Sequence, residues 1–278
     1  MQTACSRWGG GDDSEEGDTV DDVRSFDVKV NGYDYEARYS ADTVDNVFLP
    51  LLRRLKALHD RLGRRTVVFL AAPPGTGKST IATVLEMLAK DELGRDVFQS
   101  VGLDGFHYYN DYLKTHAIMR DGKPLPLKAI KGAPETFDII EFKKHLDNLP
   151  VMVRMPWPVY DRRKHNPLPK GTLIYADIVL IEGNYLLLDE DYWDDFAKMA
   201  DYRIFIGAEE SELRERLISR KAKGGITREA AEAHYERSDG PNVRRVLEHV
   251  CPHEEGYRMV EVDGVTSLIP EEAQGADA

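Results

Sequence analysis

A run of small and hydroxyl-bearing residues at 72–80, A-P-P-G-T-G-K-S-T, has the composition of a phosphate-binding loop. Gly75 and Gly77 allow the backbone to wrap around phosphate groups with its amides pointing inward. Lys78 can reach the β- and γ-phosphates of a nucleotide, and Ser79 can ligate the Mg²⁺ that accompanies them. These residue types at this spacing predict a site that binds the terminal phosphate of a nucleotide.

The segments on either side of the loop support this interpretation. Residues 66–71, T-V-V-F-L-A, are typical of a buried parallel strand, and 79–90 return to helical spacing. A helix that begins near Lys78 would point its N-terminal dipole at the phosphates. The usual pattern starts with glycine where this chain has Ala72, and a plain Gly-Pro turn is the alternative interpretation. We predict that ATP is bound by Pro74, Gly75, Thr76, Gly77, Lys78, Ser79 and Thr80.

Two acidic residues follow further apolar runs. Asp104 comes directly after 97–103, and Glu182 ends V-L-I-E at 179–182. In open α/β sheets the carboxyl ends of the strands face the ligand crevice. Asp104 could accept the proton of an attacking hydroxyl, and Glu182 could hold metal-bound water. Alternatively, Asp104 only ends its strand in a turn, and Glu182 is an ordinary loop glutamate.

Basic residues gather on one predicted helix, 211–223, which ends at a flexible Gly-Gly pair before a second predicted helix at 227–237. They are Arg214, Arg216, Arg220, Lys221 and Lys223. Arginine suits the charge that develops on a transferring phosphoryl group, because its planar fork binds two oxygens and stays protonated. We predict a lid near 211–240, with Arg220 as its catalytic residue because it is nearest the hinge. A solvated helix with neighbouring glutamates as partners is the alternative.

Strand and helix patterns alternate along the rest of the chain. A hairpin is expected over 26–39 around Asn31-Gly32, followed by an amphipathic helix over 44–62. Further strands are expected at 151–155, 178–182, 202–206 and 257–262, further helices at 138–149 and 193–200, and a long ordered loop at 123–134. Together these elements predict an α/β fold, with a doubly wound, mainly parallel sheet and helices on both of its faces. An N-terminal β-hairpin and helix are added to it.

Composition limits the partners and the compartment. The 37 basic and 49 acidic residues give a formal charge of −12, which disfavours a nucleic-acid partner. The two cysteines form no disulfide framework or C-x-x-C metal pattern. No run approaches about 18 apolar residues and no export signal is visible, so we expect no membrane partner and a cytoplasmic location.

The order of five motifs resembles the family of phosphoribulokinase, uridine kinase and type I pantothenate kinase. The motifs are P-P-G-T-G-K-S-T at 73–80, L-D-G-F-H at 103–107, K-G-A-P-E-T-F-D at 131–138, P-V-Y-D at 158–161 and V-L-I-E-G-N-Y-L-L at 179–187. The resemblance spans about 66 to 262. The third motif looks closer to pantothenate kinase and to poorly characterised bacterial members labelled sugar or nucleoside kinases than to uridine kinase.

The resemblance implies roles for several of these residues. Asp104 would be the catalytic base or positioning acid, and Glu182 would support Mg²⁺ and substrate. The residues expected to approach the phosphoryl acceptor are Tyr160, Asp161 and His165. His107 and Lys131 match motifs near the acceptor pocket, although a loop histidine and a solvated lysine are the alternatives.

Other features of the resemblance concern the nucleotide and the subgroup. Asn242, in S-D-G-P-N-V, looks like the segment that flanks the adenine, or else it caps a helix. The chain departs from the family at Ala72 and in the hairpin and helix at 26–62, which a minimal uridine kinase lacks. These departures favour an atypical subgroup.

The resulting hypothesis is a P-loop kinase that uses ATP and Mg²⁺ to phosphorylate a hydroxyl of a nucleoside, pantothenate-like or sugar acceptor. The alternative is a P-loop NTPase that acts as a regulatory switch without a metabolite acceptor, although no N-K-x-D base-recognition motif is present. A homodimer is possible, since the sequence does not fix the oligomeric state. The expected divisions are a disordered acidic tail at 1–22, an extension at 23–63, a kinase domain at 64–268 and a flexible tail at 269–278.

Overall fold

The computed structural model describes residues 22–30, 32–120 and 122–271. The acidic tail predicted at 1–22 falls outside them except for its last residue, as does the stretch from 272 onward. Within the described residues, no helix combines the length and the apolar character that crossing a membrane requires.

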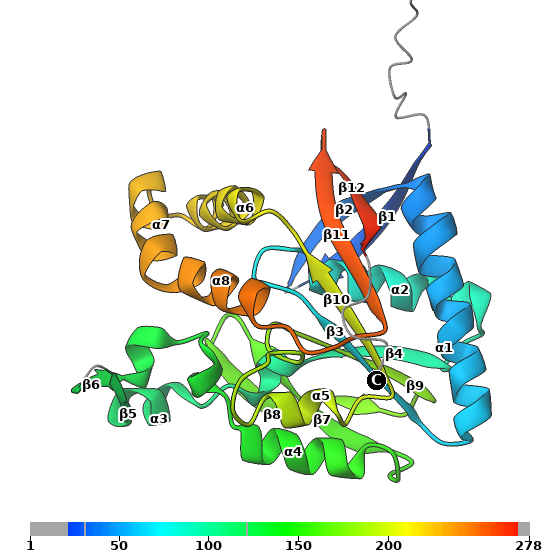
Figure 1. Ribbon diagram of the computed structural model, residues 1–278, viewed down its shortest axis with the longest axis horizontal. Coiled ribbons are helices and arrows are strands. Elements are labelled where there is room, and N and C mark those ends of the chain that lie inside the picture. The colour runs from blue at the N-terminus through cyan, green and yellow to red at the C-terminus, as the bar shows by residue number, and fades with distance from the viewer. Residues whose placement is uncertain (1–21, 31, 121, 272–278) are drawn as a thin grey trace, which may run out of the picture.

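An eight-stranded sheet runs through the molecule in the order β1-β2-β12-β11-β10-β3-β9-β4 (Figure 1). Five neighbouring strands, β11, β10, β3, β9 and β4, are parallel, and β12 joins β11 antiparallel. The bounds are β1 Val23–Val30, β2 Tyr33–Ser40, β3 Thr66–Ala71, β4 Phe98–Gly102, β9 Ile178–Gly183, β10 Tyr202–Gly207, β11 Glu255–Val262 and β12 Val265–Glu271. The parallel strands all end at one edge of the sheet, where ligands bind in open α/β folds.

Side chains alternate across β3, so each of its faces packs into a different core. Val68 and Leu70 join one core, and Val67 and Phe69 join the other. The first core includes α1 (Leu49–Leu62), α2 (Lys78–Glu92) and α6 (Glu210–Lys223). The second includes α4 (Ile139–Asn148), α5 (Asp194–Ala197) and part of α8 (Gly240–Glu248). Helices on both faces of a mainly parallel sheet confirm the predicted fold class.

The predicted N-terminal hairpin is present and belongs to the central sheet. β1 and β2 pair antiparallel, and β2 lies parallel to β12 with Tyr39 opposite Thr266. The helix that follows opens with wide, π-type turns over Thr43–Phe48 and continues as α1 to Leu62. Gly63 ends α1 with a φ of 63°, the left-handed conformation that glycine adopts without strain.

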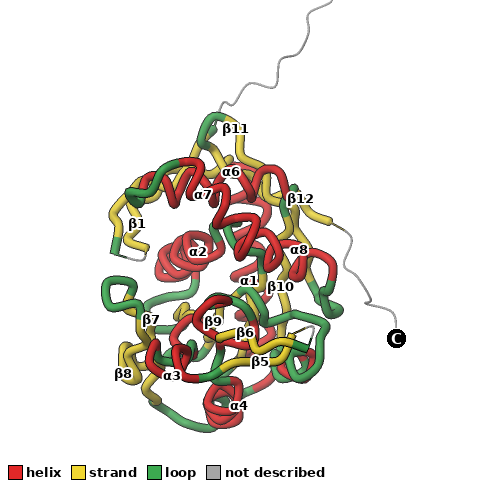
Figure 2. Tube along the Cα trace, turned by 90° about the vertical axis from the view of Figure 1, so that its left-hand side faces the viewer, coloured by secondary structure: helices red, strands yellow, loops and turns green. Residues whose placement is uncertain are grey.

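The smaller elements lie around the edge where the parallel strands end. They are α3 (Asn110–Thr115), the hairpin of β5 (Ala117–Arg120) and β6 (Lys123–Pro126), the hairpin of β7 (Met155–Asp161) and β8 (Asn166–Ile174), and α7 (Arg228–His234). Figure 2 shows α6 and α7 on one side of α2 and the β7–β8 hairpin on the other. Two separate sets of elements therefore flank the helix that follows the phosphate loop.

The structure differs from the predicted elements in three places. The strand predicted at 151–155 is wrong, because residues 151–154 form a turn whose carbonyls at Met152 and Val153 accept hydrogen bonds from Arg65. The loop predicted at 123–134 includes β6, which pairs with β5. β12 reaches Glu271, so the first three residues of the tail predicted at 269–278 are paired with β11.

Candidate active site

The predicted phosphate loop connects β3 to α2, and its glycines have the backbone angles that the motif requires. Gly75 and Gly77 have φ values of 94° and 90°, in the region that side chains disfavour. α2 begins at Lys78 with Gly77 as its N-cap residue. The loop amides and the N-terminus of a 15-residue helix thus lie at the edge where the parallel strands end, as a phosphate site requires.

The two predicted magnesium residues are in direct contact. Ser79 Oγ donates a hydrogen bond to Glu182 Oε1 at 2.8 Å. Burial raises the pKa of Glu182, with Lys78 acting in the opposite direction and Asp104 adding to the increase. A carboxylate held in place by a serine hydroxyl gives two oxygen groups side by side, the donor type that Mg²⁺ prefers.

Asp104 lies in a turn directly after β4, at the same edge of the sheet. Its Oδ2 accepts a hydrogen bond from Arg162 at 3.1 Å. Burial alone would raise the pKa of Asp104, but His107, Arg162 and Lys78 outweigh burial and hold that pKa below its usual range. Asp104 is therefore ionised at neutral pH, as a proton acceptor must be.

Lys78 is the cation between the two carboxylates. Burial lowers the pKa of Lys78, whereas the charges of Glu182 and Asp104 raise it. The sequence places these three residues in segments that are far apart, and the fold brings their charges together. Their catalytic roles stay predictions.

Two of the predicted acceptor residues, His107 and Lys131, lie beside the ring of Tyr160 at the end of β7. The rings of His107 and Tyr160 lie 5.3 Å apart between centroids, and Lys131 Nζ lies 5.2 Å from the Tyr160 centroid. Arg162, the residue that binds Asp104, lies 5.9 Å from the same ring. Burial followed by the charge of Lys128 lowers the pKa of Lys131 to about 8. Aromatic and cationic groups thus form one wall beside the candidate base.

Close packing brings this wall up to Asp104. A Cβ atom on Gly105 would lie 2.0 Å from the carbonyl oxygen of Pro158 in β7. Only glycine at position 105 therefore allows the β7–β8 hairpin to approach the turn that carries Asp104.

Two predicted acceptor residues have a structural role in the turn between β7 and β8. Asp161 Oδ1 accepts the backbone N–H groups of Arg163 and Lys164 at 2.9 and 3.1 Å, which fits the preference of aspartate for such turns. His165 is exposed, and its carbonyl oxygen accepts hydrogen bonds from Lys131 and Asn110 at 2.7 Å. Both of these contacts use the backbone of His165 and not its imidazole ring. The structure does not bring that ring to Asp104.

The basic helix α6 packs directly on the phosphate loop. A Cβ on Gly75 would meet Leu217 Cγ at 3.0 Å, and one on Gly77 would meet Arg216 Nη2 at 3.4 Å. Arg216 therefore lies close to the loop at Gly77, which helical spacing alone did not indicate. Its guanidinium also faces Glu261 of β11 at 3.5 Å.

Arg220 lies one turn further along α6. Its charge lowers the pKa of Lys78 and of Asp104. Desolvation, followed by the charge of Arg162, lowers the pKa of Arg220 itself, whereas the charge of Asp239 raises it. Among the described residues, Arg220 has no ion-pair partner, whereas Arg214, Arg216 and Lys221 are paired with Glu236, Glu261 and Asp239. An exposed, unpaired guanidinium beside the candidate base and the loop lysine is available for a phosphate group.

Asn242 lies inside the first turn of α8 and is 9% exposed. The N-cap of this helix is Asp239, so Asn242 does not cap it. No hydrogen bond within the described part of the chain joins its side chain to the phosphate loop. Its proposed place beside the adenine stays a prediction.

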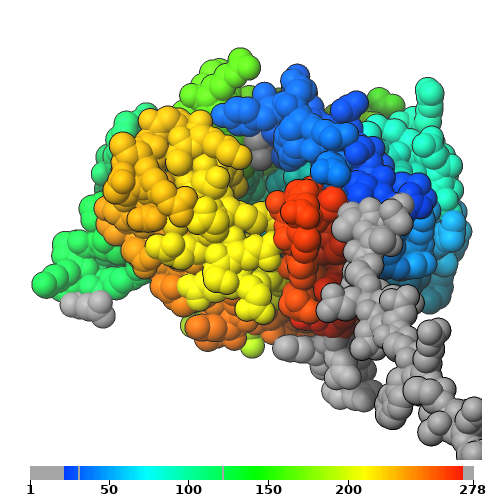
Figure 3. Space-filling view, turned by 90° about the horizontal axis from the view of Figure 1, so that it is seen from above, coloured from blue at the N-terminus to red at the C-terminus, as the bar shows by residue number. Residues whose placement is uncertain are grey.

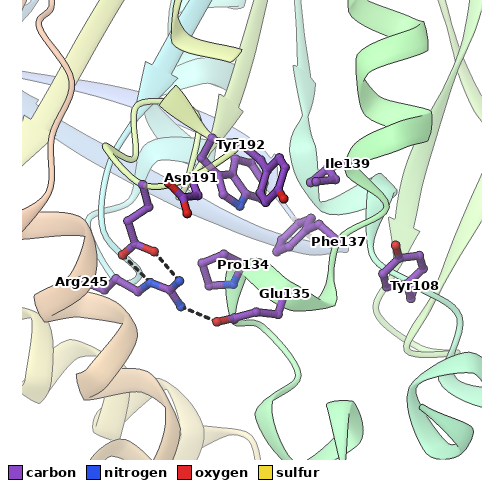
Figure 4. Close-up of a pocket in the computed structure, with 10 residues that line it drawn as sticks. Tyr108, Pro134, Glu135, Phe137, Ile139, Asp191, Tyr192 and Arg245 are labelled. Atoms are coloured by element: carbon purple, nitrogen blue, oxygen red, sulfur yellow. Dashed lines mark hydrogen bonds and ion pairs between the residues drawn. The ribbon is translucent and has the colours of Figure 1, made fainter. Parts of the chain in front are cut away.

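An open cavity of about 620 Å³ lies between α8 and the segments around 134–139 and 190–193 (Figure 4). Arg245 of α8 binds both Glu190 and Glu135 there, with Nε to Glu190 at 2.6 Å and Nη1 to Glu135 at 2.9 Å. Phe137 forms part of its wall and contacts the ring of His107 in a tilted arrangement, with 3.9 Å between ring centroids. Sequence patterns do not reveal this cluster, because its three charges come from segments up to 110 residues apart.

Comparison with known proteins identifies the family. The family described as "Phosphoribulokinase / Uridine kinase family" matches residues 67–249. The chain belongs to this family. The matched region starts in β3 and ends just after α8, so it contains the phosphate loop, both acidic residues and the basic helix.

Individual members of the family and their structures agree with this assignment. The chain is 46% identical over 223 residues to the "Uncharacterized protein YggC" of Escherichia coli (strain K12), covering 80% of this chain and 90% of that protein. It is 28% identical over 209 residues to a pantothenate kinase of Escherichia coli O1:K1 / APEC, covering 66% and 63%. A crystal structure from Silicibacter sp. TM1040, described as a "putative fructose transport system kinase", superposes with a TM-score of 0.68 at 28% identity, covering 76% of this chain and 98% of that one.

Kinases of this family use ATP with Mg²⁺, and the site fits both. Within the described residues, no cluster of three or more histidine, cysteine, aspartate or glutamate residues could hold a metal by itself. In a kinase site, nucleotide phosphates and water complete the octahedral shell around Mg²⁺. Ser79 and Glu182 are the residues that would hold the ion, and the loop amides with Lys78 would hold the phosphates.

Proposed function

We propose that this chain is a Mg²⁺-dependent kinase that transfers the γ-phosphoryl group of ATP to a hydroxyl of a small molecule. The observation that carries the proposal is the carboxylate of Asp104, which follows β4 and accepts a hydrogen bond from Arg162. The charges of Lys78 and Arg220 also lower its pKa. A phosphate-binding site alone would serve many reactions. A proton acceptor at the same edge of the sheet, next to a wall of aromatic and basic residues, is what transfer to an alcohol requires.

In the proposed reaction, each residue acts at a defined group. ATP with Mg²⁺ supplies the phosphoryl group and a metal ion that neutralises its charge. Asp104 accepts the proton of the acceptor hydroxyl as that oxygen approaches the γ-phosphorus. Lys78 and Arg220 bind the phosphoryl oxygens, where negative charge is concentrated in the transition state. The packing of α6 on the loop helps to exclude water, which would otherwise compete with the acceptor.

The acceptor belongs to the nucleosides, the pantothenate-like compounds or the sugars. Support comes from the names of similar proteins, which include a pantothenate kinase and a kinase described in relation to fructose transport. The wall around Tyr160 offers an aromatic face together with Lys131 and His107 for a polar, hydroxyl-bearing molecule. A pocket of this kind can change its substrate without any change in the phosphate chemistry.

Release of ADP tests the proposal. The protein would be incubated with ATP and Mg²⁺ and with one member at a time of a panel of nucleosides, pantothenate, ketoses and pentoses. We expect at least one acceptor to stimulate ADP release strongly, and Lys78→Ala to remove that stimulation. ATP hydrolysis that no acceptor stimulates would contradict the proposal and favour the regulatory NTPase.

A further inference from the structure

The N-terminal hairpin contacts the phosphate loop through one pair of hydroxyl groups. Tyr35 Oη of β2 lies 2.5 Å from Thr80 Oγ1, the last residue of the loop motif. Tyr35 is 42% exposed, so the contact lies at the surface of the crevice and not in the core. The contact joins the part of the chain that precedes the family match to the part that binds phosphate.

Three features fix the position of Tyr35. Tyr35, Ala37 and Tyr39 share one face of β2, and the latter two are buried. The ring of Tyr39 packs edge-on against Phe26 and Phe48, with centroids 6.2 and 5.2 Å away. β2 itself pairs with β12 of the central sheet. The phenol is therefore presented by a strand that is anchored at its far end.

The position of Thr80, on the other side of the contact, is fixed by helix α2. It lies in the first turn of α2, and its backbone N–H donates to the carbonyl of Gly77 at 2.9 Å. A threonine hydroxyl has one hydrogen to donate and lone pairs to accept with. When the Tyr35 phenol donates to Thr80 Oγ1, the hydrogen of Thr80 stays free for an acceptor at the loop.

The surroundings show why an acceptor is expected there. In Figure 3 the hairpin, α6 and the β11–β12 hairpin surround a hollow on the face above the loop. Arg216 of α6 reaches Gly77 from the same side and is held by Glu261 of β11. Three elements that are distant in sequence thus enclose one end of the phosphate loop.

We propose that Tyr35 is a positioning residue of the nucleotide site, which orients the Thr80 hydroxyl so that it donates to a phosphate oxygen of ATP. The hairpin is then part of the nucleotide site of this chain. This inference rests on the proposed function only in that the nucleotide must bind at the loop. Because Tyr35 acts through Thr80, its effect is on nucleotide affinity and not on the transfer step.

Isothermal titration calorimetry with Mg²⁺-ATP, without acceptor, tests the inference. Tyr35→Phe removes one hydrogen bond between neutral groups, so the Kd should rise about 3- to 10-fold. Tyr33→Phe is the matched control, because Tyr33 lies on the same face of β2 and is 71% exposed. The control should bind as the unmodified protein does, and both variants should keep its thermal unfolding midpoint.

A double-mutant cycle separates positioning from a general effect of the hairpin. Thr80→Val should weaken binding by itself, and adding Tyr35→Phe to it should then change the Kd by less than about 2-fold. Independent, multiplying effects of the two substitutions would overturn the inference. So would a Tyr35→Phe protein that binds Mg²⁺-ATP with the unmodified affinity. If the unmodified protein binds no Mg²⁺-ATP, the proposed function itself has failed.

Discussion

The nucleotide side and the acceptor side of this site are built in opposite ways. The nucleotide side is largely one contiguous segment, residues 72–80, whose conformation follows from two glycines between a strand and a helix. The acceptor side is assembled from Asp104, Lys131, Tyr160 and Arg162, which come from three separate segments. A contiguous motif fixes its geometry locally, whereas a distributed wall depends on how a hairpin packs. We therefore expect substitutions on the two sides to separate binding of ATP from transfer to the acceptor.

The largest effect is expected on the contiguous side. Lys78→Ala should reduce turnover on the order of 10³-fold, because it removes a preorganised charge at the phosphates. Far-ultraviolet circular dichroism and the unfolding midpoint should stay unchanged. Lys90→Ala, an exposed lysine at the other end of α2, is the matched control. A Lys78→Ala protein with full activity would remove the basis for placing the phosphates at this loop.

Loss of Asp104, the candidate base on the acceptor side, should lower the rate of phosphoryl transfer almost as much, without a similar loss in nucleotide binding. Asp104→Asn should lower kcat about 10²- to 10⁴-fold while leaving the Kd for Mg²⁺-ATP within a few-fold. The carboxamide keeps the shape of the side chain and loses its basicity. Equal losses in affinity and in kcat would show that Asp104 belongs to the nucleotide side instead.

Two arginines of α6 should differ in their effect on turnover. Arg220→Ala should lower kcat about 10²-fold with little change in nucleotide affinity, since its charge acts at Asp104 and Lys78. Arg214→Ala is the control on the same helix, because Arg214 faces Glu236 and the ring of Tyr235. Steady-state kinetics together with calorimetry would distinguish the two effects. Unchanged kcat in Arg220→Ala would refute the predicted lid residue.

The smallest effect is a shift along the pH axis. Asp104 must be ionised, and Arg162 helps to hold its pKa below the usual range. Activity is then present above that pKa and is lost as the pH falls through it. Arg162→Gln raises the pKa, so the acidic fall in kcat/KM should move to higher pH. Arg163→Gln, one residue along and exposed, should leave the profile in place.

The same contrast explains what could be predicted from sequence. β3 was predicted with the bounds that the structure shows, and the loop and the start of α2 followed, because strand, glycines and helix N-terminus are local features. Arg162 could not be selected from R-R-K-H at 162–165, since the register shift between Trp157 and Val159 decides which side chain of the hairpin faces Asp104. The triad of Arg245, Glu190 and Glu135 was missed for a different reason, because its members are up to 110 residues apart in sequence.

Other discrepancies have local causes. Val151 to Val153 are apolar and suggested a strand, but Arg65 binds the carbonyls of this segment and leaves it as a turn with exposed side chains. At 151–154, hydrogen bonds from Arg65 thus override the local preference for a strand. The motif predicts that Asp161 approaches the acceptor, and its Oδ1 accepts backbone N–H groups of its own turn, so the acceptor role stays a prediction.

The pairing of β2 with β12 has a consequence for how the protein is made. Thr43, just after β2, accepts a hydrogen bond from the backbone of Leu268, 225 residues later. During synthesis the hairpin is translated first, and the strand on which it docks follows about 225 residues later. Contacts of such sequence separation form late, because the loop between them must first be ordered. The crevice above the phosphate loop therefore gains its hairpin wall only after β12 has left the ribosome.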